Sequence, residues 1–284
     1  MPFARRLPFA LLVLALLGGC AAPASTANAI PITTRTSALP AMTTPAVAGR
    51  PTSDWTVGAS PLPTMTNGLG EVEPTPAALV NRRLPTTDYL PPPTDGQYHS
   101  SVTQPVPRDV LARSTWQAAC PVPSSALAYL TLSFWGLDGR THTGELLVNS
   151  SVAAKVTTVF GILFLERFPI EQMRITSMAE LNAPPTGDGN TTSGFNCRPA
   201  VGQTNWSAHA YGLAIDVDPF CNPYHQGGTV VPELASAYLD RGYVRPGMIL
   251  PGDATVRAFA SVGWTWGGNW TSPQDLMHFT ATDE

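Results

Sequence analysis

Two histidines and two aspartates in the second half of the chain have the types and spacing that a bound metal ion needs. His209 stands seven residues before Asp216 in the segment SAHAYGLAIDVDP, where Gly212 allows the chain to fold back before an extended stretch. Zinc accepts both an imidazole nitrogen and a carboxylate oxygen, and a catalytic zinc site usually has three protein ligands and one water molecule. The pair therefore lacks one ligand.

The end of the chain can supply this ligand and a base. His278 completes a His/Asp/His set, and Asp275 lies three residues earlier. A carboxylate at that distance can lie beside the open coordination position, where a general base must be to take a proton from the attacking water. Asp218 is an alternative ligand to Asp216, although it breaks the seven-residue spacing. The pattern predicts a hydrolytic zinc site, and the alternative is a structural role for each side chain.

The two parts of this pattern together resemble a known family. S-x-H-x-x-G-x-A-x-D over residues 207–216, followed by D-x-x-H over residues 275–278, resembles the D-alanyl-D-alanine carboxypeptidase family of zinc peptidases. Segments 194–198 (GFNCR), 222–224 (NPY) and 263–270 (GWTWGGNW) are similar to the bacterial cell-wall branch of that family. The family shares its fold with lysostaphin-type endopeptidases and the hedgehog signalling domain. The resemblance therefore implies an α+β fold with a small antiparallel sheet and flanking helices.

The resemblance also implies roles for individual residues. Members of the family usually have an arginine that stabilises the tetrahedral intermediate or holds the substrate, in a segment like S-G-Y-R. Here SGFNCR has two additional residues before Arg198, so Arg174 is the alternative. Ser207 and Tyr211 are further candidates for contacts with the substrate. The resemblance implies one zinc ion per chain, held by His209, Asp216 and His278. It also implies that Asp275 is the catalytic base and that the substrate is a stem peptide of peptidoglycan.

The apolar periodicity predicts short strands and helices from about residue 110 to the end. Apolar positions at helical spacing follow Ser150, so a helix is expected that ends before Pro169. A short helix is also possible within residues 76–83. Short strands interspersed with helices indicate an α+β domain and not a parallel doubly wound sheet. The expected strands are 127–135, 144–149, 173–178 and 277–280, and the expected further helices are 233–241 and 253–262.

The N-terminal part of the chain carries features of export. Residues 1–19 contain two arginines, an apolar run too short to span a bilayer, and a pair of glycines, which together are typical of a signal peptide. The segment LGGC resembles the bacterial lipobox, which implies lipidation of Cys20 and anchoring on the outer face of the cytoplasmic membrane. Residues 20–107 hold 15 of the 29 prolines and are predicted to be a disordered linker, followed by the peptidase domain over residues 108–284.

The number of cysteines limits the possible disulfide bonds, and the net charge limits the possible binding partners. If Cys20 is lipidated, three cysteines remain, and an exported protein can form one disulfide from them. Cys197 is expected as one partner, with Cys120 and Cys221 both open as the other. The net charge of −4 and the absence of a basic cluster argue against nucleic acid as a partner. A monomer is expected.

Three functions are compatible with these features. The first is a zinc peptidase, the second is a zinc-binding cell-wall module of the same fold without hydrolysis, and the third is a lipoprotein whose fold a metal stabilises. Asp275 favours the first, because a binding module has no need for a carboxylate beside the open zinc position. Trp264, Trp266 and Trp270 either line a substrate groove or form a packing wall.

Overall fold

The computed structural model describes residues 55–200 and 203–282. The predicted signal peptide, Cys20 and the first part of the predicted linker lie outside the described residues. Within the described part, no helix has the length and apolar character that crossing a membrane requires.

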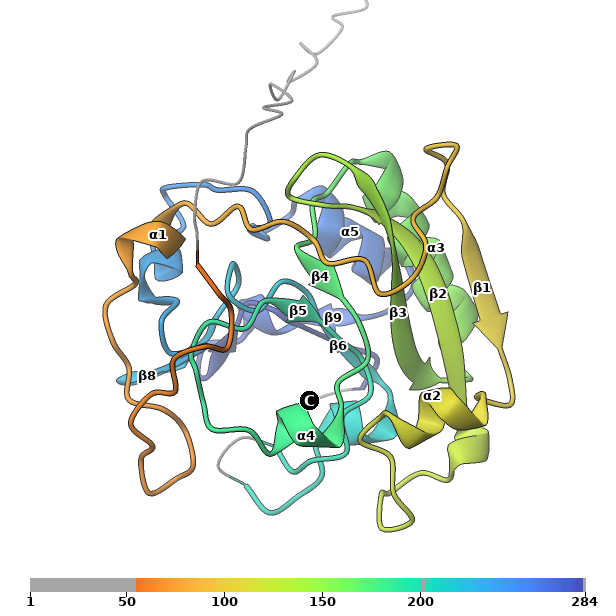
Figure 1. Cartoon of the computed structure of the whole chain (residues 1–284), viewed down its shortest axis with the longest axis horizontal. Helices are drawn as coiled ribbons and strands as arrows, with labels where there is room; N and C mark the ends of the chain where they lie inside the picture. Colours follow the sequence, from red (N-terminus) through yellow and green to blue (C-terminus); the bar gives the residue numbers. More distant parts are fainter. Residues whose placement is uncertain (1–54, 201–202, 283–284) are drawn as a thin grey trace, which may run out of the picture. The chain divides into compact units, whose positions relative to one another are not determined.

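A three-stranded antiparallel sheet forms one layer of the fold. Its strands are β1 (Ser100–Thr103), β2 (Leu127–Trp135) and β3 (Thr141–Asn149), in the order β1-β2-β3. Helix α3 (Ala153–Leu165) packs on one face of this sheet (Figure 1), because its buried side chains and those of β2 belong to one apolar cluster. The sheet and α3 thereby provide a rigid base for the shorter strands.

The other strands are short and form three small sheets. One sheet has the order β6-β11-β9 and a second has the order β10-β7-β8, while β4 pairs with β5 in parallel. Helix α5 (Ala254–Ser261) begins after Asp253, whose side chain accepts a hydrogen bond from the backbone N–H of Val256. The predicted α+β class is confirmed. The bounds are β4 (Gln172–Met173), β5 (Thr191–Thr192), β6 (Ala214–Asp216), β7 (Tyr224–Gln226), β8 (Thr229–Val231), β9 (Thr265–Trp266), β10 (Gln274–Asp275) and β11 (His278–Thr280).

Short helical segments connect these strands. The α-helical ones are α1 (Ala77–Val80), α2 (Arg108–Ala112) and α4 (Met178–Leu181), and the 3₁₀ segments are η1 (Ser124–Ala126), η2 (Ala208–Tyr211), η3 (Ser236–Leu239) and η4 (Gly267–Asn269).

The main apolar core lies between α3, α5 and the β6-β11-β9 sheet. Phe279 of β11 stacks on Phe259 of α5, with the ring centroids 3.9 Å apart. Trp264 and Trp266 are buried in the same cluster. Full burial of a large apolar side chain contributes about 1.5–3 kcal/mol. These two tryptophans therefore form a packing wall, which holds β11 in place.

Some predicted elements agree with the structure and some do not. The strand 127–135, the helix before Pro169 and the helix near 253–262 are confirmed. The predicted strand 173–178 is present only as the short β4, which ends at Met173, and Ser177 and Glu180 then form a capping box that begins α4. The predicted helix 233–241 is only the 3₁₀ segment η3, because the backbone is extended at Asp240.

The prediction of a disordered linker is wrong for residues 55–107. In Figure 1 this segment runs from α1 across the molecule to β1. Leu79 and Leu84 are buried against Phe220 and Tyr238, and Arg82 is 1% exposed. The Pro-rich composition suggested that too little apolar surface was available for burial. A few large side chains and one buried ion pair are sufficient here, because the rest of the protein provides the surface that they cover.

The buried ion pair attaches this segment to the protein. Arg82 Nε lies 2.6 Å from Glu171 Oε2, and Arg82 Nη2 lies 2.6 Å from Glu171 Oε1. Arg82 Nη1 donates to the backbone carbonyl of Asp188 at 2.8 Å, and Asn190 Nδ2 donates to Glu171 Oε2. Both partners are buried, so removing one leaves an uncompensated charge inside the protein.

We therefore expect Arg82→Met to lower the free energy of unfolding by about 3–5 kcal/mol, measured by urea denaturation. The matched control is Arg83→Met, because Arg83 is half-buried and has no ion-pair partner among the described residues; its change should stay within about 0.5 kcal/mol. Adding Glu171→Met to Arg82→Met should restore much of the loss. An Arg82→Met variant as stable as the wild type would contradict a stabilising role of the buried Arg82–Glu171 ion pair.

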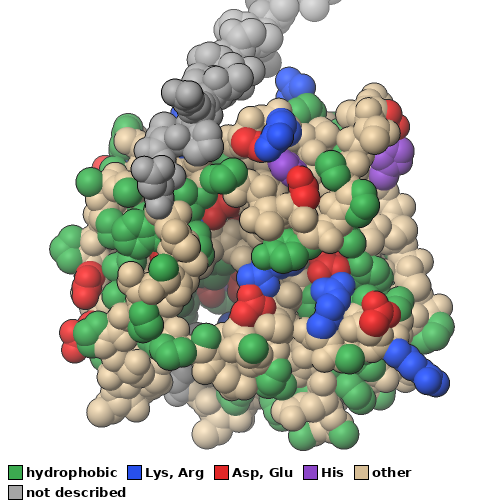
Figure 2. All heavy atoms as spheres, in the orientation of Figure 1, with side chains coloured by type: hydrophobic (Ala, Val, Ile, Leu, Met, Phe, Trp, Pro, Cys, Tyr) green, Lys and Arg blue, Asp and Glu red, His purple; other side chains and the backbone are tan. Residues whose placement is uncertain are grey.

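Charged side chains of opposite sign lie next to each other on the face shown in Figure 2, where several blue side chains adjoin red ones. Ion pairs of this kind in the described part of the chain include Arg113–Glu145, Arg140–Asp138 and Arg174–Glu180. The surface shown therefore carries no extended field of one sign.

Candidate active site

Three side chains from three different elements bring metal-ligating atoms together. His209 lies on η2, Asp216 on β6 and His278 on β11. His209 Nε2 lies 3.1 Å from Asp216 Oδ2 and 3.2 Å from His278 Nδ1, and His278 Nδ1 lies 3.2 Å from Asp216 Oδ1. One ligand atom from each residue lies within 4.8 Å of the others. The structure thus brings together the three residues that the sequence pattern selects.

The pairing of β6 with β11 places two of these ligands. The strands are antiparallel, and Asp216 lies directly opposite His278. Side chains of directly opposed residues project to the same face of a sheet, with their Cβ atoms about 4.5–5.5 Å apart. On its other side, β6 bonds to Ser193, since the backbone groups of Asp216 and Ser193 exchange both hydrogen bonds. The ligand pair is therefore fixed by backbone pairing.

His209 is held in a defined tautomer by the backbone. Its Nδ1 lies 2.7 Å from the carbonyl oxygen of Gly194, which can only accept a hydrogen bond. Nδ1 therefore carries the proton, and Nε2 presents its lone pair to the other two ligands. Ser207 caps η2 by accepting from the His209 backbone N–H, and Gly212 ends it with a φ of 68°. A Cβ on Gly212 would lie 2.5 Å from the Asn149 backbone nitrogen, so only glycine fits there.

The electrostatics of Asp216 suit a ligand. Burial by itself would raise the pKa of this carboxyl group, but the charges and hydrogen bonds of His209 and His278 outweigh burial and hold the pKa below its usual range. Asp216 is therefore ionised at neutral pH and can face two imidazoles at once. Two imidazole nitrogens and one carboxylate oxygen form the donor set of a catalytic zinc site. The residues present fit that ion.

Asp218, the alternative ligand, points elsewhere. It is fully buried, its Oδ1 accepts from the backbone N–H of Glu171 at 3.0 Å, and it is not part of the group of converging ligand atoms. Burial raises the pKa of Asp218 well above its usual range, which disfavours the charged form that a metal ligand needs. The structure therefore favours Asp216 over Asp218 as the ligand.

Asp275 lies next to the metal-ligating group on β10, where it pairs with Tyr224 of β7. Its Oδ1 is buried and has no hydrogen-bond partner among the described residues. Burial, with a further contribution from the Asp216 charge, raises the pKa of Asp275 to about 7. A partly exposed carboxyl group with a buried, unused oxygen and a pKa near neutrality has the properties of a general base.

A hollow of about 180 Å³ lies over these four residues. Arg198 and Ser207 line it, as the sequence led us to expect. Tyr211 and Arg174 do not line it: Tyr211 is partly exposed to solvent, and Arg174 pairs with Glu180. Side chains that the sequence did not single out for this site complete the lining: Ala200, Gln203, Val231, Pro273 and Met277.

Trp270 and Tyr224 form part of the wall of this hollow. The Trp270 ring lies with its centroid 5.5 Å from that of His278, so it is the one tryptophan of the GWTWGGNW segment that reaches the site. The Tyr224 hydroxyl donates to Gln226 Oε1 at 2.9 Å. The long-range pairing of β7 with β10 brings Tyr224 beside Asp275, and the local β7-β8 hairpin brings Val231 to the same hollow.

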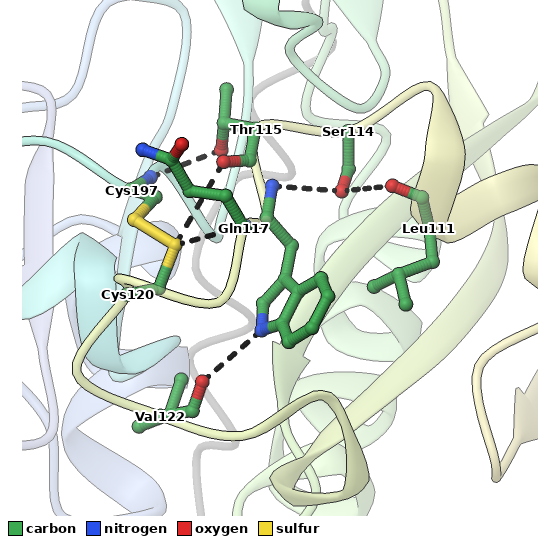
Figure 3. The surroundings of a disulfide bond; sticks show 8 residues. Leu111, Ser114, Thr115, Gln117, Cys120, Val122 and Cys197 are labelled. Carbon is green, nitrogen blue, oxygen red and sulfur yellow. Dashed lines mark hydrogen bonds between the residues drawn. A yellow bond between two sulfur atoms is a disulfide. The ribbon is translucent and has the colours of Figure 1, made fainter.

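A disulfide holds the segment that carries Arg198. Cys197 bonds to Cys120, which settles the pairing that the sequence left open, and Cys221 is a buried free thiol. Figure 3 shows the backbone nitrogen of Cys197 donating to Thr115 Oγ1, at 3.0 Å. Cys197 directly precedes Arg198 and follows Gly194 by three residues. The disulfide therefore anchors both the arginine and the carbonyl that orients His209.

The disulfide closes a long loop, since its cysteines are 77 positions apart in the sequence. Replacing Cys120 and Cys197 together by serine is expected to lower the free energy of unfolding by about 4 kcal/mol, because the unfolded chain gains loop entropy. Urea denaturation of wild type and variant checks this value. Dithiothreitol should reduce the stability of the wild type and leave that of the double variant unchanged. Equal stability of wild type and double variant would contradict the prediction.

Comparison with known proteins agrees with this geometry. Residues 201–281 match a family model described as D-alanyl-D-alanine carboxypeptidase. No curated protein and no solved structure matches the chain. The matched segment carries the three converging ligands and Asp275. Residues 201–281, which contain the candidate active site, are therefore similar to the D-alanyl-D-alanine carboxypeptidase family of peptidases.

Proposed function

We propose that this protein is a zinc-dependent carboxypeptidase that hydrolyses D-amino-acid-containing stem peptides of peptidoglycan. The observation that carries the proposal is the convergence of His209, Asp216 and His278 beside the unpartnered Oδ1 of Asp275. All four side chains face one hollow. The match to the carboxypeptidase family supports the choice of peptide bond and substrate.

The side chains divide the chemistry between them. His209, Asp216 and His278 would hold zinc, which when bound acts as a Lewis acid on a carbonyl oxygen and lowers the pKa of a water molecule. Asp275 accepts a proton at its Oδ1 from the attacking water and delivers it to the leaving amine. The Oδ1 atom is buried although the residue as a whole is partly exposed, which limits the access of bulk solvent to the transferred proton.

Arg198 is the candidate for stabilising the oxyanion or for holding the terminal carboxylate of the peptide. It lines the same hollow, and its positive charge lowers the pKa of Asp275, which places the two groups within electrostatic reach. Its Nη1 donates to the carbonyl of Pro199, so other guanidinium nitrogens remain to face a substrate. A guanidinium there can neutralise the oxyanion that forms as the scissile carbonyl is attacked, or hold the terminal carboxylate of the peptide.

Two parts of the proposal concern location. The LGGC segment supports lipidation of Cys20, and the peptidoglycan substrate requires export to the cell envelope. The non-hydrolytic zinc-binding module is the alternative. The unpartnered Asp275 oxygen argues against it, because burying a carboxyl oxygen without a hydrogen bond costs about 1–3 kcal/mol and brings a binding module no benefit.

The test measures zinc content and hydrolysis on the same preparation of the full chain. Purified protein is analysed for metal and incubated with a muramyl pentapeptide that ends in D-Ala-D-Ala, and released D-alanine is quantified. We expect one zinc per chain, release of D-alanine, loss of activity after chelation and recovery on adding zinc. One zinc per chain without cleavage of any stem peptide would favour the binding module, and absence of zinc would overturn the proposal.

A further inference from the structure

A second hollow, separate from the candidate active site, is lined by arginines. It measures about 510 Å³ and lies between α1 and residues 243–246. It shares no lining residue with the hollow over the metal ligands. Arg82, Arg83 and Arg245 line it, and none of its lining residues is an aspartate or a glutamate.

The charges of these three arginines are balanced differently. Arg82 is neutralised, since two of its nitrogens bond to Glu171. Arg83 is half-buried, and its guanidinium forms no hydrogen bond or ion pair with another described residue. An arginine often buries its aliphatic stem while its guanidinium stays in water, so the Arg83 guanidinium can bind a ligand at this hollow.

Arg245 is held rigidly without a counter-charge. It is 7% exposed, and its guanidinium lies between the rings of Tyr238 and Tyr243, 4.4 Å from each centroid. Its Nη1 donates to the carbonyl of Ala237 at 3.2 Å, while its Nε is buried and has no hydrogen-bond partner among the described residues. Aromatic rings attract a cation but do not cancel its charge. Burial, and to a smaller extent the Arg245 charge, lower the pKa of the neighbouring Arg241 to about 10.

This arrangement differs from that of arginines on the surface. Arg113, Arg140 and Arg174 each pair with a carboxylate. At the second hollow, two guanidinium charges remain uncompensated by the residues that line it. The amide of Asn81 adds a donor at the rim, because its Oδ1 accepts from the Tyr243 hydroxyl at 3.0 Å and its Nδ2 is left over.

We propose that the second hollow binds a phosphate group, with Arg83 and Arg245 as its charged ligands. The planar fork of a guanidinium matches the oxygen atoms of phosphate, and two positive charges match the dianion better than they match a single carboxylate. The phosphate can belong to the free anion or to an ester. The proposal is independent of peptide hydrolysis, because the two hollows have no residue in common.

The test titrates full-length, metal-free protein with inorganic phosphate and with glycerol 1-phosphate at constant ionic strength, by calorimetry. Removing the metal prevents phosphate from binding to zinc. We expect one saturable site with a Kd of about 1 mM or tighter, and Arg83→Gln should weaken binding about tenfold. Tighter binding of the ester than of the free anion identifies an ester as the natural ligand, and the reverse identifies free phosphate.

Two control variants locate the site. Arg108→Gln removes an exposed arginine outside both hollows and should leave the Kd unchanged. Arg198→Gln tests the catalytic hollow. Arg245→Lys keeps the positive charge but loses the fork, so it should also weaken binding while circular dichroism shows an intact fold. Lack of saturation, an unchanged Kd in Arg83→Gln, or loss of binding in Arg198→Gln would each overturn the proposal.

Discussion

Replacing Asp275 by asparagine is expected to lower kcat for D-alanine release by about 10²- to 10⁴-fold while the zinc content stays at one per chain. The range is that of a lost general base. Asparagine has nearly the same shape as aspartate and can occupy the same place on β10, but its amide cannot accept a proton at neutral pH. Asp275 belongs to no close ligand group in the structure, so metal binding should not depend on it.

The measurement combines steady-state kinetics with metal analysis. Asp240→Asn is the matched control, because Asp240 lies outside the lining of the catalytic hollow and accepts a hydrogen bond only from the nearby Gly242 N–H. It should leave kcat within a factor of about two, as surface substitutions usually do. An Asp275→Asn variant with near-normal kcat would show that another group takes the proton. A variant that loses its zinc would instead make Asp275 a ligand.

Replacing His278 by alanine is expected to abolish both metal binding and hydrolysis. The zinc affinity should fall by more than about 100-fold, because losing an outer partner of a ligand already costs 10- to 100-fold and a ligand contributes more. His278 supplies one of the three ligand atoms that lie within 4.8 Å of one another. His209 and Asp216 each supply one of the other two, so neither can take over the position of the His278 nitrogen. Competition with a fluorescent zinc chelator gives the affinity, and the release of D-alanine gives the activity.

His225→Ala is the matched control for this histidine. His225 bonds to Gln274 through its Nε2 and does not line the catalytic hollow, so its loss should change zinc affinity little. If His278→Ala bound zinc as tightly as the wild type, the metal site would have to lie elsewhere. If His278→Ala lost zinc but kept its activity, the hydrolysis would not depend on the metal.

The sequence predicted the metal site better than it predicted the walls of the hollow. His209 and Asp216 stand seven residues apart on either side of Gly212, so local geometry alone brings them near each other. His278 was found through its short spacing to Asp275. Tyr211 does not line the hollow, because a 3₁₀ segment has three residues per turn and residues two apart point in different directions. The β7-β8 hairpin that carries Val231 has a local signal in Gly227-Gly228, but its pairing with β10, which brings it to the hollow, has none.

The secondary structure was predictable where apolar residues repeat regularly over a long segment. The nine residues of β2 and the thirteen of α3 show such a repeat, whereas β4, β5, β9 and β10 have two residues each and show none. The N-terminal segment was misjudged for a different reason. Its composition is poor in apolar residues, and the partner of Arg82 lies 89 residues away. Such a contact depends on the whole fold and leaves no local pattern.

The attachment of this segment has a consequence for where the protein can be shortened. A chain trimmed to residues 108–284 would retain all the candidate catalytic residues, yet it would lack Arg82, Leu79 and Leu84. Glu171 would then be a buried carboxylate without its guanidinium partner, and part of the cluster around Phe220 and Tyr238 would be exposed to water. The smallest unit that keeps these contacts therefore begins no later than Leu79, far ahead of the segment that carries the candidate catalytic site.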